Sequence, residues 1–136
     1  MDNYTEEYVK HVNVDHLIDR FCAGEGMIEL DRESLSYLYE ASHIEAHYAS
    51  SDQMEGIGRM GEIMARLRLK CFPHIRNFSH ITFCIGSSRE MPVTMTEIRQ
   101  IDLFLEDLDS EPEIMWGVHY RPLTTNMLEV DVVMSR

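Results

Sequence analysis

The spacing of the histidines is the feature of this sequence that most readily suggests chemistry. His43 and His47 are four residues apart, so on a helix both would lie on one face, where a zinc ion could bridge them. On a strand they would also share a face, but about 13 Å apart, which is too far for one ion. No CxxC or HExxH motif completes a metal site. We therefore expect solvent-facing histidines, no metal and no other cofactor.

The other residue types that carry chemistry lack the arrangement that chemistry needs. There is no GxSxG nucleophile motif and no GxxxxGK[ST] phosphate-binding pattern, and GxGxxG spacing occurs at Gly56, Gly58 and Gly61. Gly56 and Gly58 belong to a helical pattern, which indicates helix packing and not a phosphate loop. The carboxylates Glu29, Asp31 and Glu33 stand where acidic side chains favour a helix N-terminus. The sequence thus indicates no self-sufficient catalytic or nucleotide site.

Composition and charge narrow the classes of partner. Asp and Glu outnumber Lys and Arg by 24 to 12 in 136 residues, and no basic stripe could neutralise successive phosphates, so nucleic acid is not expected. Cys22, Cys71 and Cys84 are an odd number without a CxxC pair, which is typical of core residues in a reducing compartment. No apolar run reaches the roughly 18 residues of a membrane helix, and the N-terminus is acidic, so we expect no membrane partner and a cytoplasmic location.

The first half of the chain alternates helical and strand patterns. Loosely helical spacing within residues 1–22 predicts a leading helix that ends at the following AGEG. A second, brief helix is expected after Asp31, which can cap it. Residues 42–48 alternate as in a strand, and residues 57–71 form an amphipathic helix that Pro73 ends.

The second half predicts one helix among strands. The apolar run 81–85 indicates a central strand. Thr94 and Glu97 form a capping box for a helix that ends before the acidic segment at 109–112. Two late strands, 113–120 and 127–134, are expected to pair as a hairpin, with Trp116 in the core.

These elements define the expected fold class. The order (α)αβαβαββ favours an α+β domain with a mixed four-stranded β-sheet and packed helices. We expect a single domain over residues 1–136, in which residues 1–25 form a leading helix and linker and residues 26–136 form the core.

Three segments, taken in order, resemble the C-terminal subdomain of FtsZ, the bacterial relative of tubulin. GMIELDRESLSYLY (26–39) resembles the loop and helix start that open that subdomain, with a family pattern close to G-L-I-N-x-D-F-A-D-V. EPEIMWGVHYRP (111–122) resembles D-A-N-I-I-W-G-x-x-x-D-P, and LEVDVVMS (128–135) resembles the closing strand I-R-V-T-V-I-A-T. The resemblance covers roughly residues 12–136 and implies the fold of the FtsZ/tubulin C-terminal domain.

The resemblance also implies where a partner would bind. In FtsZ filaments the opening loop enters the nucleotide site of the neighbouring subunit and supplies acidic residues that help position the attacking water. By alignment Asp31 matches the first of those acids, Glu29 replaces an asparagine and Ser34 replaces the second acid. The family's glycine-rich GGGTGT-type loop does not occur here. We therefore expect no GTPase activity, and docking on a GTPase without its activation.

Two hypotheses of different classes follow. The first is a free-standing, non-enzymatic protein-interaction domain that docks on or caps a tubulin-like GTPase, or associates with itself. Its contact candidates are Glu29, Asp31, Arg32, Glu33 and Ser34. The competing interpretation is that these residues only cap a helix.

The second hypothesis is a small-molecule-binding or enzymatic homo-oligomer with its site between subunits, since domains of this type can associate in that way. Its candidate polar groups are His43, Glu45, His47, Arg89 and His119.

Overall fold

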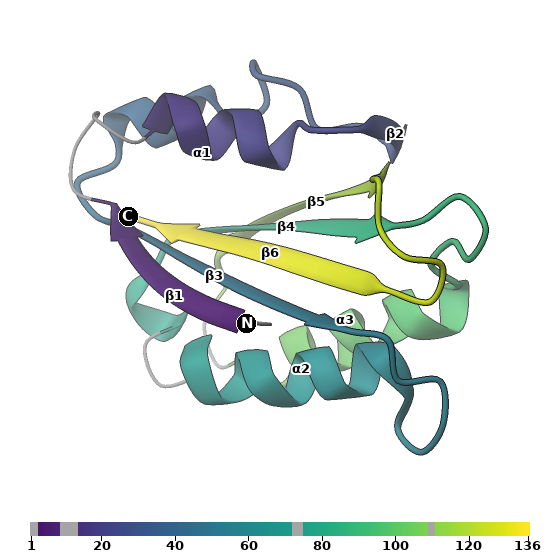
Figure 1. Cartoon of the computed structure of the whole chain (residues 1–136). Coiled ribbons are helices and arrows are strands. Elements are labelled where there is room, and N and C mark those ends of the chain that lie inside the picture. The colour runs from purple at the N-terminus through teal and green to yellow at the C-terminus, as the bar shows by residue number, and fades with distance from the viewer. Residues whose placement is uncertain (1–2, 9–13, 72–74, 109–110) are drawn as a thin grey trace.

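A mixed sheet of six strands forms the centre of the molecule. The computed structural model describes residues 3–8 (as backbone only), 14–71, 75–108 and 111–136. The spatial order of the strands is β1-β3-β6-β4-β5-β2 (Figure 1). Their bounds are β1 Asn3–Tyr8, β2 Glu25–Ile28, β3 Ile44–Ser51, β4 His80–Ser87, β5 Glu113–Tyr120 and β6 Leu128–Ser135.

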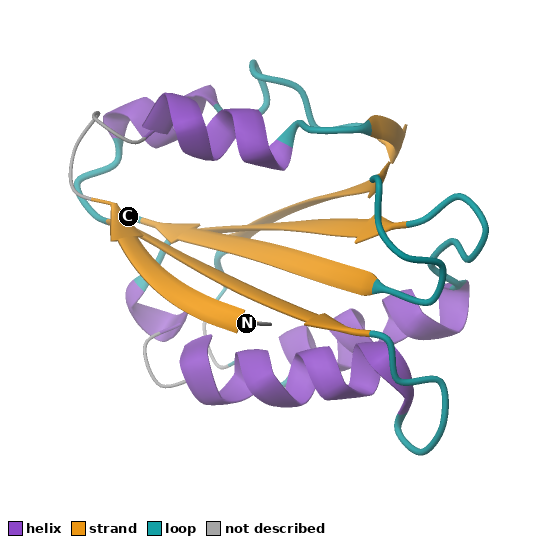
Figure 2. Cartoon of the chain, viewed as in Figure 1, coloured by secondary structure: helices purple, strands orange, loops and turns teal. Residues whose placement is uncertain are grey.

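Helices cover both faces of this sheet (Figure 2). Helix α1 (Val14–Phe21) and the short 3-10 helix η2 (Ser36–Glu40) lie on one face, and α2 (Gly58–Cys71) and α3 (Met95–Glu106) lie on the other. A second 3-10 helix, η3 (Ile75–Asn77), precedes β4. Two apolar cores result, because each face of the sheet packs on its own helices.

The expected α+β class with a mixed sheet is confirmed, whereas the strand count of four and the late hairpin are wrong. β5 and β6 are not neighbours, because β4 lies between them, parallel to β5 and antiparallel to β6. The turn-rich segment between the last two strands therefore crosses over the end of β4 and does not form a tight hairpin. The extra strands, β1 and β2, pair at the two edges of the sheet, with β3 and β5 respectively.

The N-terminal region differs from the prediction of one leading helix. Residues 3–8 pair antiparallel with β3, and the helix spans only Val14–Phe21; residues 9–13, including Val9 and Val12, lie outside the described residues. Within α1 the buried positions Val14, Leu17, Ile18 and Phe21 follow the spacing 0, 3, 4 and 7.

The elements with strong local signals agree with the structure. The capping box at α3 has both of its hydrogen bonds, since the Thr94 side chain accepts from Glu97 N–H and the Glu97 carboxylate accepts from Thr94 N–H. Strands appear at 44–51 and 80–87 and a helix appears at 58–71, close to the predicted ranges, while Pro73 falls outside the described residues. The brief second helix is a turn at 32–35 followed by η2.

Candidate docking loop

The segment Glu29–Ser34, here called the Asp31 loop, connects β2 to η2. Buried Leu30 (3% exposed) and Leu35 (0%) hold its two ends, and Asp31, Arg32 and Glu33 between them are exposed. Two buried leucines thus fix a short charged turn at the surface, on the α1 side of the sheet.

Asp31 and Ser34 determine the shape of this turn. Asp31 Oδ1 accepts hydrogen bonds from the Ser34 backbone N–H and from the Ser34 hydroxyl, each at 2.8 Å. The backbone bond and then the side-chain bond lower the pKa of Asp31, because both favour its charged form. Asp31 therefore caps the turn at 32–35 and not a helix, since η2 has no side-chain cap, and one of its two carboxylate oxygens is occupied.

The remaining charged residues differ in how firmly they are held. Arg32 pairs with Asp19 and, at 3.5 Å, with Asp15, both on α1. Glu29 and Glu33 are exposed, and no side-chain hydrogen bond or ion pair of either is found within the described part of the chain. The loop therefore presents two unengaged carboxylates beside a guanidinium that is tied to α1.

His119 attaches the segment before the loop to the sheet. Its Nδ1 lies 2.9 Å from Ala23 O, and its Nε2 accepts from Leu30 N–H at 3.1 Å. These partners assign the neutral tautomer with the proton on Nδ1. The side chain is 1% exposed, so His119 links the backbone of residues 23 and 30 to β5 and is not a ligand group at the surface.

A buried group of charges lies between α1 and the sheet. The Arg121 side chain is 6% exposed and pairs with Glu129 at 2.9 Å and with Asp131 at 3.1 Å. Arg20 pairs with Asp131 at 2.7 Å, and the Tyr48 hydroxyl donates to Glu129 at 2.7 Å. Burial raises the pKa of Asp131, and the two arginines counteract that shift. Two cations and two anions therefore balance each other under the helix that carries Asp15 and Asp19.

Arg121 also caps the C-terminal end of α1. Its guanidinium donates to the carbonyl oxygens of Arg20 at 3.0 Å, Phe21 at 3.5 Å and Ala23 at 3.3 Å. A cation at a helix C-terminus satisfies carbonyl groups that have no helical partner. One side chain thus links α1, β5 and β6.

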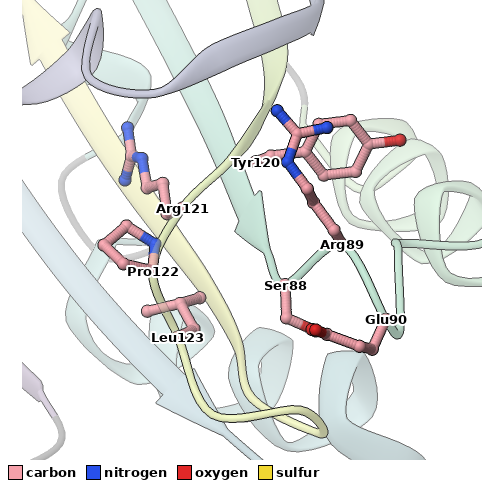
Figure 3. A pocket seen from close by; sticks show the side chains of 7 residues that line it. All are labelled: Ser88, Arg89, Glu90, Tyr120, Arg121, Pro122 and Leu123. Carbon is pink, nitrogen blue, oxygen red and sulfur yellow. The ribbon is translucent and has the colours of Figure 1, made fainter.

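An open hollow lies at the carboxyl ends of the parallel strands β4 and β5 (Figure 3). Its volume is about 420 Å³, and its walls are Ser88 to Glu90 and Tyr120 to Leu123. Arg89 stacks on the Tyr120 ring, 4.6 Å from its centroid, and pairs with Glu25 of β2. Both arginines of this hollow are therefore neutralised by carboxylates.

The five residues of the alternative ligand site do not come together in one chain. His43 directly precedes β3, and Glu45 and His47 lie on its first half, level with the first half of β4 across β6, whereas Arg89 follows the end of β4. The two ends of an eight-residue strand are about 23 Å apart, and His119 lies under the β2 segment.

The prediction that His43 and His47 face solvent is wrong for His47. Its side chain is buried on the α2 side, with Nε2 2.7 Å from Glu45 Oε1, while His43 is partly exposed and 3.9 Å from Glu45. β3 is an interior strand with helices on both faces, so its polar positions are also covered. The described residues contain no group of three His, Cys, Asp or Glu side chains that could hold a metal ion.

Comparison with solved structures assigns the fold to the FtsZ-like class of α+β domains. The chain matches a point mutant of FtsZ from M. jannaschii with a TM-score of 0.66 and 16% sequence identity. The match covers 92% of this chain and 37% of the FtsZ chain, so it spans little more than a third of that protein. That share is consistent with the C-terminal subdomain. Neither the protein-family models nor the curated proteins give a match.

At this identity the likeness establishes the fold, which confirms the resemblance found in the three sequence segments. Within the described residues, no helix is long and apolar enough to span a membrane.

The sequence analysis did not predict the buried cluster of charges formed by Arg20, Arg121, Glu129 and Asp131. Glu129 and Asp131 alternate with valines, which correctly places them on one face of β6. Alternation alone, however, predicts that this face is exposed to solvent. The available signal was the pair of carboxylates on a strand whose other residues up to Met134 are apolar, because a central strand can carry such charges only beside buried cations.

Proposed function

We propose that this chain is a non-enzymatic protein-interaction domain that docks through the Asp31 loop on a tubulin-like GTPase. The observation that supports the proposal most is the FtsZ-like fold combined with the position of the loop. The resemblance implies that the matching loop of FtsZ meets the nucleotide site of a neighbouring subunit. Here that loop is anchored at both ends and exposes its charges.

The chemistry of the loop favours docking over activation of the partner. In the alignment Ser34 replaces the second acid, and in the structure it donates both of its hydrogen bonds to Asp31. The loop therefore has only one of the two family carboxylates, and one oxygen of that carboxylate already accepts hydrogen bonds within the loop. A carboxylate that orients the attacking water must be free to accept from it, so we expect the chain to bind a GTPase without raising its turnover.

The charge pattern defines which surface of the partner would fit. Glu29 and Glu33 are exposed and unengaged in the described part of the chain, so they would contact basic side chains or backbone N–H groups. Such contacts at an exposed rim add association rate and specificity more than affinity. We expect the binding to weaken as salt is raised.

The experiment is a pull-down of the tagged chain from lysate of its source cell, with and without GTP. The partner is identified by mass spectrometry and then purified for co-sedimentation. The test variant is Glu29→Lys/Glu33→Lys, because neither side chain supports the fold. The matched control is Asp52→Lys/Glu55→Lys, which reverses two exposed carboxylates on the loop between β3 and α2.

The proposal expects recovery of a tubulin-like GTPase, loss of binding in the test variant and unchanged binding in the control. Equal binding by the two variants would reject the Asp31 loop as the contact surface. A purified chain that hydrolyses GTP, or that raises the partner's turnover, would contradict a non-enzymatic role.

A further inference from the structure

One edge of the sheet is open beside an apolar groove. β2 pairs with β5 only at Val118, His119 and Tyr120, near one end of the strand (Figure 1). Among the described residues, no strand pairs with β5 from Glu113 to Gly117 on the side away from β4. About five residues of β5 therefore form a free edge.

The backbone groups of this edge point outward. Glu113 N–H donates to Ser79 O and Arg121 N–H donates to Ser87 O, both toward β4. Because successive residues of a strand turn their amides to opposite sides, Ile114 and Trp116 direct their N–H and C=O groups away from β4. These are the groups that an added strand would pair with.

The side chains that line the groove between this edge and α3 are apolar except for Asp102. A hollow of about 200 Å³ has Phe83 at its base, Ile98, Ile101 and Leu105 of α3 on one side, and Ile114 and Trp116 of β5 on the other. An apolar cavity of about 150 Å³ holds a benzene ring, so this hollow has room for a large apolar side chain. Trp116, expected in the core, is instead 37% exposed here, and Ile114 is 38% exposed.

The rim of the groove is acidic. Asp102 lines it, Glu106 is exposed on the next turn of α3, and the Glu113 side chain is 84% exposed at the start of β5. Arg99 is the single basic residue within α3, and the whole chain carries a formal charge of −12. A segment that enters the groove would be favoured by basic residues beside its apolar ones.

The same charges disfavour a second copy of this chain as the occupant. A twofold pairing of two β5 edges would place the same patch on both sides of the interface. Each copy carries a formal charge of −12, so two copies would repel each other on approach, and like-charge juxtaposition across an interface is costly. The occupant that fits is therefore a segment of a different protein.

We propose that the groove between β5 and α3 binds an extended apolar segment with basic flanks, which adds to the sheet as a strand beside β5. Main-chain hydrogen bonds to Ile114 and Trp116 supply part of the affinity, and the hollow selects a large apolar side chain at one position. This surface is formed by different elements from the Asp31 loop, so the two proposals fail or succeed independently.

Trp116 makes the test direct, because it is the only tryptophan in the chain. The probe is a synthetic peptide in which about five alternating isoleucines and threonines are flanked by two lysines at each end. We expect saturable binding with a blue shift of Trp116 emission as its ring leaves water. Replacing the flanking lysines with glutamates should weaken binding at least about tenfold at low salt.

Two comparisons separate strand addition from simple apolar contact. Two further peptides carry N-methyl groups on every second backbone amide, one peptide on the odd residues and the other on the even residues. Each peptide lacks the N–H donors along one of its two edges. At least one of the two should bind about tenfold more weakly than the parent peptide. Ile114→Glu should abolish binding, whereas Leu69→Glu, at an 82% exposed site on α2, should leave it unchanged. Calorimetry and the melting temperature of each variant confirm that the fold is retained.

No change in Trp116 emission up to millimolar peptide would overturn the proposal. So would equal binding of the parent and both N-methylated peptides, or equal binding by Ile114→Glu and Leu69→Glu. Light scattering that shows a dimer in which Trp116 is already shielded would assign the groove to a second copy and would also overturn it.

Discussion

Replacing Arg121 with methionine should destabilise the domain strongly, because Arg121 is the buried cation that holds α1 on the sheet. Methionine keeps most of the apolar length of the side chain, so the change removes the charge and the hydrogen bonds more than the packing. Glu129 then keeps the Tyr48 hydroxyl as its partner, and Asp131 keeps Arg20. The carbonyl oxygens of Arg20 and Ala23 at the end of α1 each lose one of two donors and keep Ala23 N–H and His119 Nδ1–H respectively.

The size of the effect follows from this geometry. Removing one partner of a buried ion pair costs about 3–5 kcal/mol, because the other charge remains buried and unpaired. A chain of 136 residues has an unfolding free energy of roughly 7–20 kcal/mol at typical values per residue. The variant should therefore fold with a clearly lower stability, measured by urea unfolding and followed by far-UV circular dichroism.

A double-mutant cycle with Glu129→Gln isolates the pair. In the Arg121→Met background, Glu129→Gln removes a buried charge that no longer has a cation beside it. The loss of unfolding free energy caused by Glu129→Gln should therefore be about 2 kcal/mol smaller there than in the parent chain. A loss below about 1 kcal/mol for Arg121→Met, or an equal cost of Glu129→Gln in both backgrounds, would refute the assignment of Arg121 as the support of α1.

Two further predictions concern ionisation. Burial tends to raise the pKa of Glu97, but hydrogen bonds from Arg59 and Thr94 outweigh it and the net shift is downward. The stabilisation of the fold by ionised Glu97 is therefore present above its unfolded-state pKa of about 4.3. It is lost as the pH falls through the lower pKa of Glu97 in the folded state. Glu97→Gln should cost about 3 kcal/mol at pH 7, with the difference shrinking on acidification; a difference constant from pH 7 to pH 3 in urea unfolding would contradict the pairing. Burial raises the pKa of Cys71 and of Cys84 to about 12, so at pH 8 a thiol reagent should modify partly exposed Cys22 first and the other two only after unfolding. Rapid labelling of all three would show that the two cores are open.

The sequence predicted best the elements whose signals are local. The Thr94 and Glu97 capping box involves residues three apart, and the apolar run of β4 is bounded by Gly86, so both were found. The segment containing Asp31 was singled out by its resemblance to FtsZ; Asp31, Arg32 and Glu33 are exposed, and their role in binding stays a prediction.

Properties that depend on distant partners could not be read from the sequence. The hairpin prediction was wrong because β4, which lies earlier in the chain, separates the last two strands. Trp116 was expected in the core because an aromatic residue on a strand is usually covered, but α3 covers β5 incompletely. The burial of His47 depends on α2, which covers that face of β3, and on β1, which pairs with β3 and makes it an interior strand.

The most direct test of the proposed docking is co-sedimentation of the purified chain with GTP-assembled filaments of the tubulin-like GTPase that is proposed as its partner. The parent chain and Asp52→Lys/Glu55→Lys should co-sediment to the same extent, while Glu29→Lys/Glu33→Lys should remain in the supernatant, and GTP turnover should not rise in any mixture. Co-sedimentation of all three proteins to the same extent would contradict docking through the Asp31 loop.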